Sequence, residues 1–435
     1  MSARNRELLG LVPASLLLTL GFAAIFIQQS AAQSDLSLTY GVAFLLLCLA
    51  GHLVIRFTLP YADPYLFPLV AVLACFGLVV VYRIDETLAR DQAEWFVVGL
   101  ILFAVTIIFL RDFRVLERYR YTVAAAGLLL LLLPRVPGIG QQVNGAYLGV
   151  GFGPVTFQPA EFGKIAIVIF LAAYLRDTRE VLVQGSHRFL GMTLPPLKHL
   201  GPLLVVWGGA MVMLVFIRDL GSSLMFFGGF LALLYVATNR VSFVAVGLGL
   251  FALGAWFFAG TVGHVQNRID TWRDPFDRVL YDEPGGSYQI AQSLFAQADG
   301  GLFGTGFGQA LITQPGGGAI LPAPQTDLIY AVITNELGLA GACGLLLVYL
   351  MVVERGFKIA MLARDSFSKL LAAGLTSVFA LQVFVIVGGV TKVIPLTGVT
   401  LPFVSYGGSS IVANFVLLAL LLLISDRARR PLGLR

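Results

Sequence analysis

The chain has 435 residues, of which 58% are hydrophobic and only 12% are charged. Soluble globular domains carry about a quarter charged residues, so this composition excludes a soluble enzyme and also a disordered chain. The net charge of +5 reflects loop topology in a membrane protein rather than nucleic-acid binding. We therefore expect membrane lipids around the chain and no nucleic-acid partner.

Apolar stretches recur along the whole sequence. A helix that crosses about 30 Å of hydrocarbon needs about 20 predominantly apolar residues. Twelve stretches qualify or come close, which predicts an all-α, polytopic integral membrane protein. These predicted spans are residues 9–28, 41–57, 65–81, 95–110, 121–133, 161–175, 200–216, 221–238, 242–262, 327–353, 370–390 and 410–425.

Lysine and arginine are distributed unequally between alternate loops. With the N-terminus inside, twenty of the 29 Lys and Arg residues fall on the cytoplasmic side and nine outside. Positive charge collects in cytoplasmic loops, so this distribution predicts that both termini are cytoplasmic. The outer side then holds three long polar segments, Leu133–Ala160, Gly263–Thr326 and Thr391–Ser409. We expect any chemistry on that side of the membrane.

The first candidate motif is Gln158–Lys164, at the start of a predicted span. Pro159 suits the first turn of a helix, and Glu161 and Lys164 share one helical face. An ion pair at the lipid boundary is one interpretation. An ionisable pair at the edge of a span is costly, however, and indicates a functional or buried polar site.

A second motif, Arg218–Ser223, joins two predicted spans with almost no loop. Arg218 and Asp219 there are candidates for a polar turn that lines a cavity. Asp219 can equally cap the helix that follows, and the two interpretations are compatible.

The long outer segment contains the glycine-rich run Gly300–Gly308. A dinucleotide-binding fingerprint requires a preceding strand and a following helix, and neither is predicted here. We therefore reject nucleotide binding, and the glycines indicate close backbone packing or a close approach to phosphate. Arg278, earlier in the same segment, is a candidate cation.

Two further polar stretches enter or leave predicted spans. Asp327 follows Pro322 and Pro324 and stands at or next to the start of a long apolar helix, where it could act as a cap. Glu336 is half a turn out of phase and about 13 Å deeper, which argues against a glycosidase-like carboxylate pair. The second stretch, with Lys392, Ser405 and Ser409, is irregular backbone at membrane depth, which is tolerated where it is buried or lines a cavity.

Together these five motifs, in this order, closely resemble the SEDS family, whose members include RodA, FtsW and SpoVE. The resemblance is carried by Gln158–Lys164, Arg218–Ser223, Tyr288–Ser293 with Gly300–Gly308, Leu321–Gly338 and Gly398–Ser410. Residues 1–64 look like the two additional N-terminal helices of twelve-span members, beside a core of residues 65–435 whose outer loop is 263–326.

The resemblance implies a bacterial enzyme that polymerises lipid II into peptidoglycan glycan strands on the outer face of the cytoplasmic membrane. Asp327 matches the family's essential aspartate, and Glu161 and Lys164 match its Gln-Pro-Ser-Glu helix, with Ala160 in place of serine. One departure is Tyr147-Leu148, where many members have Arg-Trp. The family also implies a class B penicillin-binding protein, a transpeptidase, as partner.

Such a reaction needs a base for the attacking sugar hydroxyl and positive charge for the departing diphosphate. Asp327 is the candidate base or, alternatively, the candidate ligand for a divalent cation, Mg²⁺ or Mn²⁺. The candidate substrate-binding residues are Glu161, Lys164, Arg218, Asp219, Arg278, Lys392, Ser405 and Ser409. Two alternatives stay open: a lipid II flippase, and a non-catalytic scaffold for a transpeptidase.

Overall fold

The structure is a computed structural model of the chain. It describes residues 2–28, 34–143, 146–152, 155–184, 187–189, 192–194, 208, 219–261, 263–283, 285–313 and 319–431.

Long apolar helices dominate the described residues. Eight of them are long and apolar enough to cross a membrane, which confirms the prediction of an all-α polytopic membrane protein. Every predicted span coincides with a helix, except 200–216, which lies outside the described residues apart from residue 208.

The chain folds as two units. Unit 1 comprises Met1–Arg111, Thr271–Arg355 and Gln382–Arg435, and unit 2 comprises Asp112–Asp270 and Gly356–Leu381. The predicted division into residues 1–64 and 65–435 is a different one and stays a prediction. In unit 1 lie α1 (Ala3–Gln28), α2 (Ser34–Thr58), α3 (Leu66–Ile84), α4 (Glu86–Phe109), α12 (Arg278–Asp282), α13 (Tyr288–Gly300), most of α14 (Ile329–Leu362), the end of α15 (Ser366–Val390) and α16 (Gly408–Arg429).

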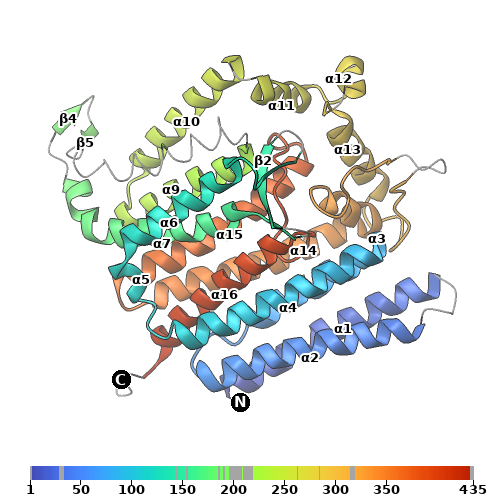
Figure 1. Cartoon of the computed structure of the whole chain (residues 1–435), viewed down its shortest axis with the longest axis horizontal. Helices are drawn as coiled ribbons and strands as arrows, with labels where there is room; N and C mark the ends of the chain where they lie inside the picture. The colour runs from blue at the N-terminus through green and yellow to red at the C-terminus, as the bar shows by residue number, and fades with distance from the viewer. Residues whose placement is uncertain are drawn as a thin grey trace. The chain divides into compact units, whose positions relative to one another are not determined.

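In unit 1 the aromatic side chain of Phe415 packs α16 against α4. Its ring centroid lies 5.1 Å from that of Phe96 and 6.0 Å from that of Phe103. A Cβ atom at Gly99 would lie 2.5 Å from the Phe415 ring, so glycine is what lets the two helices approach. Figure 1 shows α4 and α16 side by side, and α1 and α2 as a hairpin.

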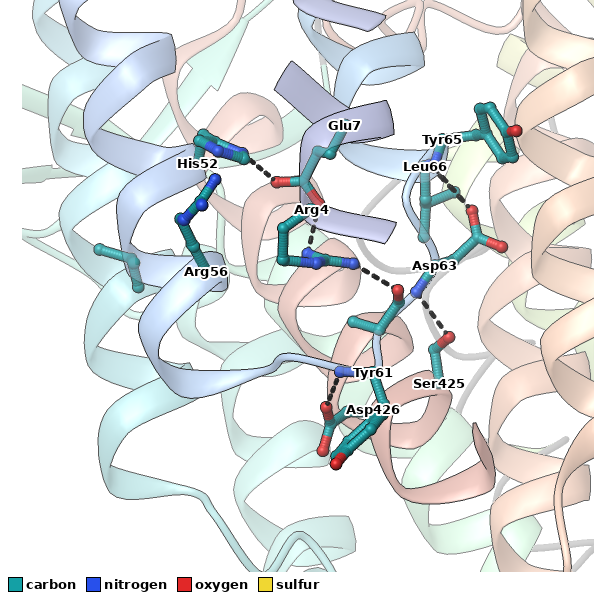
Figure 2. A network of polar contacts seen from close by, with 12 residues as sticks. Arg4, Glu7, His52, Arg56, Tyr61, Asp63, Tyr65, Leu66, Ser425 and Asp426 are labelled. Carbon is teal, nitrogen blue, oxygen red and sulfur yellow. Dashed lines mark hydrogen bonds and ion pairs between the residues drawn. The ribbon is translucent and has the colours of Figure 1, made fainter. Parts of the chain in front are cut away.

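A network of buried polar groups joins the start of α1 to the end of α2 (Figure 2). Glu7 is fully buried, and its carboxylate pairs with Arg4 and lies 2.8 Å from Nδ1 of His52. Arg4 also donates to the carbonyl of Ala62, in the connection between α2 and α3. The N-terminal hairpin is therefore attached to the rest of unit 1 by polar contacts as well as by apolar packing.

The same network continues to the C-terminal end of α16 (Figure 2). The N–H of Tyr61 donates to Asp426 over 2.8 Å, and the N–H of Asp63 donates to Ser425 over 3.0 Å. Asp63 is fully buried and pairs with Arg429. These bonds fix the start of α3 to the end of α16.

Unit 2 is built around α7 and α9, with part of α15 between them. A Cβ atom at Gly374 of α15 would lie 2.8 Å from Val168 of α7 and 2.9 Å from Leu233 of α9. This unit contains α5 (Val115–Arg118), α6 (Arg120–Leu132), η2 (Leu133–Arg135), α7 (Pro159–Gln184), α9 (Leu220–Thr238) and α10 (Val241–Thr261). A further helix, α11 (Gly263–Arg273), spans the boundary at residues 270–271.

Unit 2 also contains short strands that the sequence did not predict. The first of the three long polar segments forms β1 (Gly140–Val143), β2 (Ala146–Phe152) and β3 (Val155–Phe157) in an antiparallel sheet of that order. The register pairs Val150 with Gly140 and Phe157, and Val150 is fully buried. A second pair, β4 (His187–Phe189) and β5 (Met192–Leu194), follows α7. The sheet places β3 directly before the start of α7.

Candidate active site

Asp327 stands in unit 1, two residues before the start of α14. The connection leading to it is tightly turned: the carbonyl of Ala323 accepts from the N–H groups of Thr326, over 3.2 Å, and Leu328, over 3.4 Å. Ala323 itself has a φ of 47°. Asp327 is half-buried, and the backbone before it is held in place by these bonds.

Ser405 and Tyr406 hold the two residues before Asp327. The hydroxyl of Ser405 donates to the carbonyl of Thr326 over 2.8 Å and accepts from the N–H of Leu401 over 2.9 Å. The N–H of Tyr406 donates to the carbonyl of Gln325 over 2.8 Å. Ser405 is buried, so the structure gives it a role in positioning, and its binding of substrate stays a prediction.

Gly398 brings the backbone of the segment between α15 and α16 close to the Asp327 carboxylate. A Cβ atom at Gly398 would lie 3.6 Å from Oδ2 of Asp327. Its φ of 73° lies in the left-handed region, which favours glycine. Glycine therefore allows an exposed backbone to lie beside the carboxylate.

Three other predicted site residues belong to unit 1. Lys392, with a φ of 61°, donates from Nζ to the carbonyl of Arg273 over 3.4 Å. Arg278 is exposed at the start of α12. Ser409 is buried in the first turn of α16. The substrate-binding roles of these three residues stay predictions.

In unit 2 the first turn of α7 carries the predicted pair. Nζ of Lys164 donates to Oε2 of Glu161 over 2.6 Å. Lys164 is 3% exposed and Glu161 9% exposed. Lysine side chains are rarely buried to this extent unless they are paired. The burial of this pair agrees with the interpretation of a buried polar site.

Asp219 lies in the same electrostatic environment. It caps α9 by accepting from the N–H of Ser222 over 2.9 Å, so the capped helix start considered from the sequence is present. Burial raises the pKa of the Asp219 carboxyl above its usual range and the charge of Glu161 adds to this, while the Ser222 bond and the charge of Arg268 oppose it. Glu161 and Arg268 are thus each close enough to act electrostatically on Asp219.

Arg268, in α11, was not among the sequence candidates. It belongs to the long polar segment 263–326, which contains several arginines. Nothing in the sequence distinguishes Arg268 from the others, and its proximity to Asp219 is known only from the structure. Arg218, which was a candidate, lies outside the described residues.

Tyr147, which stands where many SEDS proteins have arginine, lies next to an arginine from another part of the chain. The guanidinium carbon of Arg135 lies 4.2 Å from the centroid of the Tyr147 ring, within the range of a cation–π contact. The sequence at 147–148 lacks the arginine of many family members, but a cation from η2 stands beside this residue.

A divalent cation was predicted as a candidate ligand of Asp327. Among the described residues there is no group of three or more His, Cys, Asp and Glu side chains that could hold a metal ion. Mg²⁺ is commonly held by one or two carboxylates together with substrate phosphates, without an all-protein cage. Asp327 fits that mode of binding.

The fold and these clusters define a multi-pass membrane protein with a half-buried carboxylate at one helix start and a buried lysine–glutamate pair at another. The sequence model of the cell cycle protein family FtsW/RodA/SpoVE matches residues 63–430. The chain therefore belongs to this family.

Similar proteins agree with that assignment. The chain is 44% identical to the peptidoglycan glycosyltransferase RodA of Mycobacterium tuberculosis H37Rv, over 99% of this chain and 92% of that protein. It is 32% identical to the stage V sporulation protein E of Bacillus subtilis, over 80% of this chain and 90% of that protein.

Solved structures with the same fold are also similar. A chain from a study of how a peptidoglycan synthase complex coordinates polymerization and crosslinking aligns with a TM-score of 0.66 and 25% identity, covering 85% of this chain and 98% of that one. The rod shape determining protein RodA of Thermus thermophilus aligns with a TM-score of 0.60 and 26% identity, covering 85% and 98%.

Proposed function

We propose that this chain is a peptidoglycan glycosyltransferase, which polymerises lipid II into glycan strands at the outer face of the bacterial cytoplasmic membrane. The observation that carries the proposal is 44% identity to mycobacterial RodA over nearly the full length of both chains. The half-buried carboxylate of Asp327 supplies the acid–base group that the reaction requires.

The proposed reaction joins two sugars and releases a lipid diphosphate. A hydroxyl of the acceptor sugar attacks the anomeric carbon of the donor, and the bond from that carbon to the diphosphate breaks. Asp327 accepts the proton of the attacking hydroxyl, because it is a carboxylate that is accessible to substrate and fixed by its backbone. Ser405 contributes by holding the carbonyl of Thr326, next to the proposed base.

The departing diphosphate carries negative charge that must be stabilised. Lys164, Arg218, Arg278 and Lys392 are the proposed cationic groups, and Arg268 is added because its charge acts on Asp219. The alternative role for Asp327, in place of the base, is to hold a Mg²⁺ or Mn²⁺ ion, which would neutralise diphosphate charge when bound.

The proposed partner is a class B penicillin-binding protein with transpeptidase activity. Support comes from the similar chain in a complex that is described as coordinating polymerization and crosslinking. A polymerase and a transpeptidase acting on the same strands are expected to work side by side.

Polymerisation of lipid II by the purified protein tests the proposed function directly. Full-length protein in detergent or liposomes, supplied with lipid II, is expected to yield glycan strands that separate by size on a gel. Liposomes also distinguish the alternatives. Lipid II that crosses the bilayer without being polymerised would identify a flippase, and no reaction in the presence of an active transpeptidase partner would favour a scaffold.

The orientation is tested by labelling in intact cells. Asp299 is exposed on α13, within the segment that the Lys and Arg distribution places outside. In a Cys343→Ser background, which removes the one exposed cysteine of the described residues, Asp299→Cys is expected to react with a membrane-impermeant maleimide. Labelling only after the cells are permeabilised would show that residue 299 lies on the cytoplasmic side, contrary to the proposed orientation.

A further inference from the structure

Helix α14 is interrupted at Gly338, eleven residues after Asp327 along the chain. Gly338 has φ 65° and ψ −171°, which is not helical. In an unbroken helix the N–H groups of Leu339 and Ala340 would donate to the carbonyls four residues before them, at Asn335 and Glu336. Neither bond can form across this break.

The glycine-rich turn that follows α13 supplies replacements for both lost bonds. Leu339 donates to the carbonyl of Gly301 and Ala340 to that of Leu302, each over 3.0 Å. The freed carbonyls accept in turn: Asn335 from the N–H of Thr305 over 2.9 Å, and Glu336 from that of Gly306 over 3.1 Å. The turn is therefore inserted into the helix.

The fit leaves no room for side chains. A Cβ atom at Gly304 would lie 2.1 Å from the backbone oxygen of Glu336, and one at Gly338 would lie 2.3 Å from the nitrogen of Gly304. Both glycines also have positive φ values, 84° and 65°. The sequence allowed two interpretations of the glycine run, close backbone packing or a close approach to phosphate. These contacts support close backbone packing.

A buried ion pair fastens the far end of the inserted turn. Nη2 of Arg83, in the last turn of α3, lies 2.8 Å from Oε1 of Glu336 and donates to the carbonyl of Ala310 over 2.8 Å. The side chain of Glu336 is 2% exposed and that of Arg83 9%. The pair thus joins α3, α14 and the turn.

Stability alone does not account for such a pair. The cost of removing two charges from water roughly offsets their attraction, so a buried ion pair is often no more stabilising than apolar side chains of similar size. What an apolar pair could not do is donate to the carbonyl of Ala310, as Arg83 does. The pair therefore fixes the position of the turn.

The helical segment that begins beside Asp327 is held at both ends. From Ile329 to Leu337 it is about 13 Å long. Ser405 and Tyr406 hold the backbone just before Asp327, and the inserted turn with Arg83 and Glu336 holds the other end. Ile329, at the start of the segment, and Val332, within it, are fully buried.

We propose that Glu336, together with Arg83, is a positioning residue for Asp327. The pair holds the inserted turn in the break of α14, and this sets the direction of the helical segment that carries the proposed base. The proposal rests on the proposed glycosyltransferase function. A displacement of about 1 Å in a reacting group lowers the rate by as much as about 10²-fold, so loss of the pair acts on turnover rather than on substrate binding.

Glu336→Gln is the central test, since it keeps the shape and removes the charge. We expect kcat for lipid II polymerisation to fall about ten- to a hundredfold, with KM changed less than about twofold. Glu7→Gln is the matched control. Glu7 is likewise buried and paired with an arginine, near the opposite end of α3. It is expected to lower the melting temperature by a similar amount and to leave kcat unchanged.

The double variant Arg83→Met/Glu336→Met distinguishes two effects of losing the ion pair. One is the cost of a buried charge without its partner, and the other is the loss of the bonds that hold the turn. It removes both charges, so thermal stability is expected to recover relative to Glu336→Gln. It cannot bond to the turn, so kcat is expected to stay low. A kcat restored by the double variant, or a Glu336→Gln kcat no lower than that of Glu7→Gln, would overturn the proposal.

Hydrogen exchange gives a readout that does not depend on activity. Peptides covering residues 327–340 are expected to exchange faster in Glu336→Gln than in Glu7→Gln or the unmodified protein. Equal exchange in the two variants would refute the positioning role even if the unmodified protein failed to polymerise lipid II. That failure by itself would count against the proposed function.

Discussion

Asp327→Asn is expected to lower lipid II polymerisation about 10²–10⁴-fold, the usual range for loss of a general base, while the protein folds normally. Asparagine keeps the shape of the side chain but cannot accept the proton of the attacking hydroxyl. The backbone bonds that surround residue 327 come from Ala323, Ser405 and Tyr406, and they do not depend on the carboxylate. Initial rates of strand synthesis by the purified variant measure the effect.

A purely structural Asp327 leads to a different result. As a cap, asparagine is about as good as aspartate, so the variant would retain most of its activity. Near-normal polymerisation by a well-folded Asp327→Asn protein would therefore remove Asp327 from its proposed role. Asp299→Asn is the matched control, because Asp299 is an exposed carboxylate in the same unit. Its activity and melting temperature are expected to be unchanged.

Local sequence patterns were sufficient to locate several parts of the molecule. Apolar runs mark the helices because a membrane-crossing segment must satisfy its backbone internally and be apolar over its length. Asp327 could be placed next to the start of α14, because two prolines precede it. The pair of Glu161 and Lys164 followed from their spacing, because residues three apart share a helical face.

Contacts between distant segments could not be predicted in this way. Gly338 stands in a long apolar run, and nothing near it shows that residues 301–306 replace its helical hydrogen bonds. Arg83 and Glu336 are far apart in sequence, and each is also compatible with a charge at a span boundary. Arg268 is one of several arginines in a long polar segment. Such pairings depend on the packing of the whole unit, which a single sequence does not reveal.

Lys164→Met is expected to lower polymerisation about 10²–10³-fold, the range found when one group that stabilises developing negative charge is removed. Methionine keeps much of the length of the side chain and removes its charge. Lys164 is also paired with Glu161, so part of any loss could come from leaving a buried carboxylate without its cation. Melting temperature and lipid II binding, measured beside activity, show how much of the loss is structural.

Charge reversal distinguishes a diphosphate ligand from a structural partner. Glu161→Lys/Lys164→Glu keeps an ion pair three residues apart on α7 but moves the positive charge by about one helical turn. If Lys164 stabilises the departing diphosphate, the double variant should recover thermal stability and remain nearly inactive. Recovery of polymerisation would instead make the pair structural. Lys369→Met, at an exposed position of the same unit, controls for the loss of a positive charge and is expected to keep full activity.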